Sequence, residues 1–138
     1  MTFGPPATES HDAGWAWVGG GGDAVSVALH EREGVTVIAI SGEVDISNID
    51  RVSAAIFALP NTAAGLVVDL TAVTYLDSSA VSLIHDLAIR LRRRSQRLVV
   101  VCNPQSAPHR VLELTALDSN APILDSLDPA IRMINDEL

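Results

Sequence analysis

The chain has 138 residues, of which 48% are apolar and 19% are charged, a composition that suits one compact domain and excludes a wholly disordered protein. Nine basic and 17 acidic side chains give a formal net charge of −8, which argues against direct nucleic-acid binding because a phosphate backbone requires a basic footprint. The longest apolar runs fall far short of the roughly 20 residues that span a bilayer, and the N-terminus lacks the basic start and apolar segment of a secretory signal. We therefore expect a cytoplasmic protein without a membrane span.

The first 22 residues differ in composition from the rest of the chain. They hold two adjacent prolines, scattered Ser, Thr and Ala, and four consecutive glycines, so they bury too little apolar surface to offset the entropy of ordering. This composition predicts a flexible tail over residues 1–22 and a single domain over residues 23–138. Within the tail, Trp15 and Trp17 share one face of an extended segment, where they could cap an apolar patch on the domain or on a partner.

A β-hairpin opens the expected domain. From Val25 onward, apolar residues alternate with small or polar ones, as in a strand with one buried face. Residues 31–34 then predict a turn, and the β-branched run at residues 35–41 supplies a second strand. The two runs should pair antiparallel.

Helices and strands alternate over the rest of the chain. The expected elements are a helix from Ser47 to Pro60, a strand over residues 66–70, a helix from Asp77 or Ser78, a strand over residues 97–102, a helix over residues 104–115, a strand over residues 122–126 and a last helix capped by Asp128 with Pro129 at its first position. The run at residues 97–102 is apolar on both faces, which places it inside the sheet and makes Cys102 a buried core residue. The order predicts an α/β two-layer sandwich, with a mixed, mostly parallel sheet of four to five strands and the helices on one face.

Two strand-to-helix junctions carry the polar residues of greatest interest. Asp77, Ser78 and Ser79 follow a strand and precede an apolar helix, where their oxygens can accept from the free backbone N–H groups of the helix. Helix capping by itself would be enough to explain this cluster. A second acidic cluster, at residues 42–45, ends the preceding strand, and in a parallel sheet such junctions converge on one edge.

The sequences Gly-Glu-Val-Asp at residues 42–45 and Leu-Asp-Ser-Ser-Ala-Val at residues 76–81 resemble the paired motifs of the STAS domain, in particular of bacterial anti-sigma factor antagonists. The resemblance extends over residues 23–137 and implies a STAS-like fold. It also implies that an anti-sigma factor, itself a serine kinase, phosphorylates Ser78 and that a serine phosphatase reverses this modification. In that family, the unphosphorylated antagonist sequesters the kinase and frees a sigma factor, so the resemblance implies a role in regulating transcription.

The same resemblance assigns the residues of the partner-binding surface. Asp77 and Ser79 flank the acceptor Ser78, and Asp45 lies nearby. The expected partner-binding residues are Asp45, Asp77, Ser78, Ser79 and Ala80. Ala80 stands where the family usually has glycine, and we expect it to stiffen the start of the helix. The protein would be a substrate and not an enzyme, so no cofactor, metal ion or catalytic residue is expected.

Other interpretations stay open. Ser78 or Ser79 as an enzyme nucleophile would need His85, which lies about 10 Å along the helix, too far for contact, and no Gly-x-Ser-x-Gly motif is present. STAS-like modules also occur in stress-signalling scaffolds and lipid-transport assemblies, where the serine need not be phosphorylated. The arginines at residues 90–97 suit either a solvated helix end or a docking patch for an acidic protein.

Overall fold

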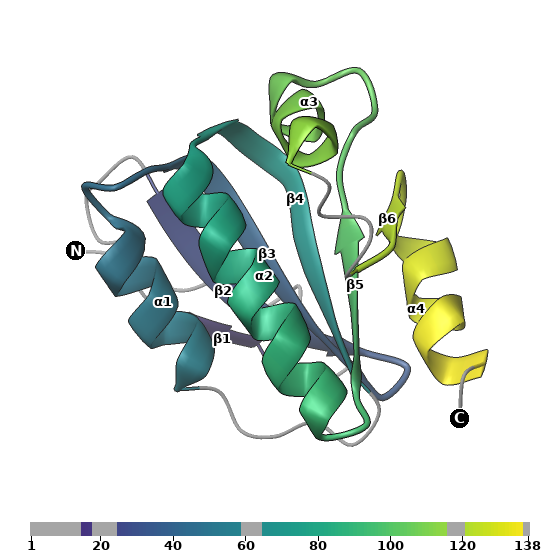
Figure 1. The fold of residues 1–138 in the computed structure, drawn as a ribbon. Coiled ribbons are helices and arrows are strands. Elements are labelled where there is room, and N and C mark those ends of the chain that lie inside the picture. Colours follow the sequence, from purple (N-terminus) through teal and green to yellow (C-terminus); the bar gives the residue numbers. More distant parts are fainter. Residues whose placement is uncertain (1–14, 18–24, 59–64, 116–120, 137–138) are drawn as a thin grey trace.

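The computed structural model describes residues 15–17, 25–58, 65–115 and 121–136 (Figure 1). The strands are β1 (Trp15–Trp17), β2 (Val25–Arg32), β3 (Val35–Val44), β4 (Gly65–Leu76), β5 (Arg97–Val101) and β6 (Ile123–Leu124). The helices are α1 (Ile49–Phe57), α2 (Ser78–Arg93), α3 (Ala107–Leu114) and α4 (Leu127–Asp136).

These strands form one mixed sheet in the order β1-β2-β3-β4-β5-β6. The first three strands are antiparallel, and β3 to β6 are parallel. The predicted hairpin is confirmed: Glu33 and Gly34 connect β2 to β3 with φ angles of 52° and 80°, the left-handed geometry that a tight two-residue turn requires. The carboxyl ends of β3, β4 and β5 all point to one edge, where α1, α2 and α3 begin (Figure 1).

Helices cover both faces of the sheet. One core joins α1, α2 and α3 to inward residues such as Ile38 and Val68, whereas Val37, Val67 and Val99 pack with α4 on the other face. The α/β fold class is confirmed, but the expectation that all helices share one face is corrected for α4. The reason is that β3, β4 and β5 are apolar on both faces, so each face needs its own cover.

The edges of the sheet differ from the sequence prediction. The strand β1 lies inside the range predicted as a tail, and its backbone pairs with β2, with Ala16 opposite Leu29. The sheet therefore has a sixth strand. The rest of the predicted tail, residues 1–14 and 18–22, lies outside the described residues, as does the predicted helix end at Pro60.

The last helix begins one residue before Asp128 and ends by Asp136. Asp128 is therefore in the first turn of α4. The sequence prediction that Asp128 caps this helix is wrong. Its carboxylate instead accepts a hydrogen bond from the Arg32 guanidinium at 3.0 Å. Asn135 donates to the Glu33 carbonyl oxygen at 3.3 Å, so both ends of α4 are linked to the β2–β3 hairpin.

Most of the arginine-rich segment forms the end of α2, while Arg97 begins β5. Arg90, Arg92 and Arg93 lie in the last turn, where cations complement the helix dipole, as the helix-end interpretation predicts. Arg90 also lies over the Phe57 ring, 4.3 Å from its centroid, and this contact joins the ends of α1 and α2.

Candidate functional site

The two polar clusters singled out in the sequence meet at one edge of the sheet. Val44 and Leu76, the last residues of β3 and β4, are partners in the parallel ladder. The Asp77 N–H donates to the Val44 carbonyl oxygen at 3.3 Å, which extends the pairing by one residue. The β3–α1 loop, residues 45–48, therefore lies beside the N-terminus of α2.

Asp77 connects these two segments through its carboxylate. Its Oδ1 accepts from the backbone N–H groups of Ser79 at 2.9 Å and Ala80 at 3.3 Å and also from the Ser79 hydroxyl, so Asp77 is the N-cap of α2. Its Oδ2 accepts from the Ile46 N–H at 3.1 Å. The cap predicted from the sequence is confirmed, and the bond to Ile46 adds a contact across 31 residues of chain.

The hydrogen bonds around Asp77 favour its ionised form. Burial raises the pKa of this carboxyl group, but the hydrogen bonds from Ser79, Ala80 and Ile46 together outweigh burial and hold the pKa below its ordinary value of 3.8. Asp77 is therefore ionised at neutral pH and places a fixed negative charge directly before Ser78.

Asp77→Ala should lower the free energy of unfolding by about 1 kcal/mol at neutral pH, because the substitution removes the N-cap. The folded-state pKa lies below the unfolded value, so this stabilisation is fully present above the unfolded pKa, near pH 4, and is lost as the pH falls through the folded pKa. Urea unfolding at pH 7 and at several values below 4 measures the difference between the two proteins. Asp86→Ala, on the exposed side of α2, is the control and should change stability by less than about 0.5 kcal/mol. If the difference in free energy of unfolding between wild type and Asp77→Ala stayed the same below pH 4, the stabilising role of the ionised Asp77 carboxylate would be contradicted.

The β3–α1 loop is ordered by its own side chains. Asp45 Oδ1 accepts from the Ser47 N–H at 2.9 Å and from the Ser47 hydroxyl. The Asn48 side chain accepts from the Asp45 N–H at 3.1 Å and donates to the Glu43 carbonyl oxygen at 2.9 Å. Sequence reasoning placed the helix start at Ser47 and missed Asn48, which is 5% exposed. The Asp-x-x-Asn spacing was the available signal, because such side chains bond to nearby backbone.

The two serines of the motif have different environments. Ser78 is the exposed first residue of α2, and its hydroxyl has no hydrogen-bond partner in the described part of the chain. Ser79 is half-buried, and its hydroxyl donates to Asp77. Ala80, which is also expected in the partner-binding surface, is 3% exposed, and its side chain packs in the core.

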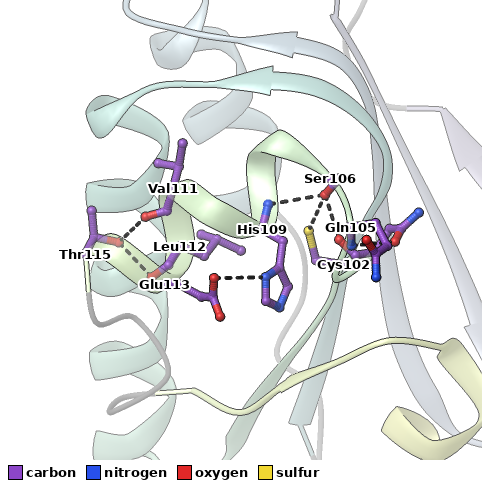
Figure 2. A network of polar contacts seen from close by, with 9 residues as sticks. Cys102, Gln105, Ser106, His109, Val111, Leu112, Glu113 and Thr115 are labelled. Atoms are coloured by element: carbon purple, nitrogen blue, oxygen red, sulfur yellow. Dashed lines mark hydrogen bonds and ion pairs between the residues drawn. The ribbon is translucent and has the colours of Figure 1, made fainter.

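A third junction at the same edge surrounds the only cysteine of the chain (Figure 2). Ser106 caps α3 by accepting from the His109 N–H at 3.2 Å, and the Cys102 Sγ lies 3.6 Å from the Ser106 hydroxyl oxygen. Burial is the largest effect and raises the pKa of the Cys102 thiol. The hydrogen bond with Ser106 lowers the pKa in part, and the nearby charge of Asp69 raises it by a smaller amount. Cys102 is thus a buried, protonated core residue, as its sequence context predicted.

Two negative observations apply to residues 15–17, 25–58, 65–115 and 121–136. In these ranges, no group of three or more His, Cys, Asp and Glu side chains is arranged to hold a metal ion. No helix there is both long and apolar enough to cross a membrane.

The mixed sheet with its two motifs at one edge defines a STAS domain. The STAS family model matches residues 26–130, which is most of the chain, and this protein belongs to that family. A comparison with curated proteins gave no significant match.

Solved structures with the same fold include bacterial anti-sigma factor antagonists and part of a mammalian anion transporter. The crystal structure of an anti-sigma factor antagonist from Mycobacterium paratuberculosis is 28% identical, with a TM-score of 0.75 over 83% of this chain and 97% of that chain. The phosphorylated form of the Bacillus cell fate determinant SpoIIAA is 21% identical, with a TM-score of 0.58 over 79% of this chain and 99% of that one. The murine anion transporter Slc26a9 is 11% identical, with a TM-score of 0.66 over 94% of this chain but 23% of the transporter.

Proposed function

We propose that this protein is an anti-sigma factor antagonist whose binding to a serine-kinase anti-sigma factor is controlled by phosphorylation of Ser78. One observation carries the proposal: Ser78 is the serine of the motif that projects into solvent, whereas Ser79 is engaged by Asp77. The likeness to the mycobacterial anti-sigma factor antagonist, which extends over 97% of that structure, supports the antagonist role. The protein would act in the cytoplasm, where release of a sigma factor regulates transcription in response to stress.

In the proposed switch, this chain supplies only the hydroxyl group that is phosphorylated. Ser78 Oγ would bond to the γ-phosphorus of ATP while the bond to ADP breaks, and a base on the kinase would take the hydroxyl proton. Hydrolysis by a serine phosphatase would restore the hydroxyl. In this scheme the chain is the substrate of both reactions and needs no cofactor or metal ion of its own.

The electrostatics of the α2 N-terminus explain how the phosphate would act as a switch. It would add about −1.5 to −2 charges beside ionised Asp77 and near Asp45. The helix N-terminus offsets part of this charge, typically by 0.3 to 1 kcal/mol, so the fold should persist. A partner packed over the Ser78 hydroxyl would have to desolvate the phosphate, so the interface should not persist.

A second candidate function keeps the fold and removes the switch. The murine anion transporter contains the same fold within a chain about four times longer than the matched part, so the fold also occurs in proteins that are not anti-sigma factor antagonists. For this protein, the alternative is an interaction module of a stress-signalling or lipid-transport assembly whose Ser78 stays unmodified.

Intact-mass spectrometry separates the two functions. The wild-type protein is incubated with ATP and each candidate serine-kinase anti-sigma factor, beside Ser78→Ala and the matched control Ser82→Ala, an exposed serine one turn further along α2. A gain of one phosphate group in wild type and in Ser82→Ala, but not in Ser78→Ala, supports the proposed switch. Tight binding without phosphate would support the scaffold, and neither binding nor phosphate would overturn the proposed function.

A further inference from the structure

The β3–α1 loop exposes an apolar side chain next to the proposed switch. Ile46 is 74% exposed, although isoleucine is among the residues most often found inside proteins. A single exposed apolar residue is ordinary in proteins, but Ile46 lies next to the proposed phosphorylation site. Its backbone N–H is bonded to Asp77, the residue directly before Ser78.

The loop around Ile46 is held in place without burying its side chain. Asp45 accepts from both the N–H and the hydroxyl of Ser47, and buried Asn48 bonds to the backbone on both sides of Val44. The Asp77 carboxylate holds the centre of the loop at Ile46. An apolar side chain on a backbone that is already ordered costs little further entropy on binding, which is the property of an interface anchor.

We propose that Ile46 is an apolar anchor of the surface that binds the anti-sigma factor, and that Asp77 is the positioning residue that holds Ile46 beside Ser78. This inference rests on the proposed function and identifies the partner chemistry: an apolar pocket on the kinase, next to the surface that covers the Ser78 hydroxyl. A phosphate on Ser78 opposes the same contact, because Ile46 can enter its pocket only if the neighbouring dianion loses water.

The anchor is tested by titrating the kinase that phosphorylates the wild-type protein, without ATP, into unphosphorylated Ile46→Ser. Loss of an anchor residue should weaken binding by about tenfold or more. The matched control is Ile89→Ser, which removes another exposed isoleucine. Ile89 lies on α2, about 16 Å along the helix axis from Ser78, so this variant should bind as wild type does. Equal affinity of wild type and Ile46→Ser would overturn the inference, while phosphorylation of the wild-type protein in the same preparation would leave the proposed function standing.

The positioning role of Asp77 is tested by Asp77→Asn, because asparagine has one acceptor oxygen and cannot serve both the α2 N-terminus and the Ile46 N–H. We expect the Ile46 amide to exchange with deuterium about tenfold faster, as local opening becomes easier. Asp77→Asn should also weaken kinase binding in the wild-type background but have little further effect on Ile46→Ser, because the two residues act through one contact. The positioning role of Asp77 would be overturned if the Ile46 amide exchanged at the wild-type rate in Asp77→Asn. It would also be overturned if the losses of binding free energy from Asp77→Asn and Ile46→Ser were additive in the double variant.

Discussion

Ser78→Glu should bind the anti-sigma factor about a hundredfold more weakly than the wild-type protein, a loss of roughly 3 kcal/mol. The Ser78 side chain lies on the solvent side of the α2 N-terminus, so the partner must pack directly over it to sense its state. A carboxylate there adds a charge beside ionised Asp77 and must lose water when the interface closes. The fold should tolerate it, because acidic side chains are favoured in the first turn of a helix.

Isothermal titration with the anti-sigma factor measures this loss. Ser126→Glu is the matched control, because it adds the same charge at an exposed position just before α4, away from the α2 N-terminus. Thermal unfolding should show that both variants are folded. If Ser78→Glu bound as tightly as Ser126→Glu, control of binding by charge at Ser78 would be wrong.

Ile131→Ala should lower the free energy of unfolding by about 2 to 5 kcal/mol, the usual loss when a large side chain is removed from a core. Ile131 is 1% exposed on the inner side of α4, where it belongs to the second core with Val67 and Val99. That core covers the sheet face that α1, α2 and α3 leave open. Since a domain of this size is stable by only about 5 to 15 kcal/mol, the loss is a large fraction of the total.

Urea unfolding followed by circular dichroism measures the effect of Ile131→Ala. Arg132→Ala, the exposed neighbour on the same helix, is the control and should change stability by less than about 0.5 kcal/mol. At temperatures where the variant remains folded, its affinity for the anti-sigma factor should equal that of wild type, because α4 is not at the α2 N-terminus. A loss below about 1 kcal/mol would show that α4 is not an essential cover of the sheet.

Much of the fold was predictable because its signals are local. The alternation that begins at Val25 and the tight turn at Gly34 define the hairpin within a few residues of chain. The 16 residues of α2 are also marked locally, by the Asp77 cap at one end and by arginines at the other. The sequence likewise identified the two motifs that converge at the edge of the sheet.

Other features depend on contacts between distant residues and were not predictable. Nothing in the local pattern of the last helix says which face of the sheet it covers, and Asp128 gave a misleading capping signal because its partner, Arg32, is 96 residues away. The three-residue strand β1 has too few residues for a periodic pattern, and its identity depends on pairing with β2. Ala80 is placed in the core by packing against the sheet and not by its helix position alone.

The sequence by itself determined the family signature, the serine that we propose as the phosphate acceptor and the aspartate that caps its helix, because each of these is read from a few neighbouring residues. Only the tertiary structure decided that Ser78 faces solvent while Ser79 is engaged, and that Asp77 also holds Ile46. The physical reason is that the parallel pairing of β3 with β4 brings Val44 beside Leu76, and with them two loops that are 31 residues apart in the chain. Periodicity and capping rules describe each loop, but the hydrogen bond between them exists only once the sheet has formed.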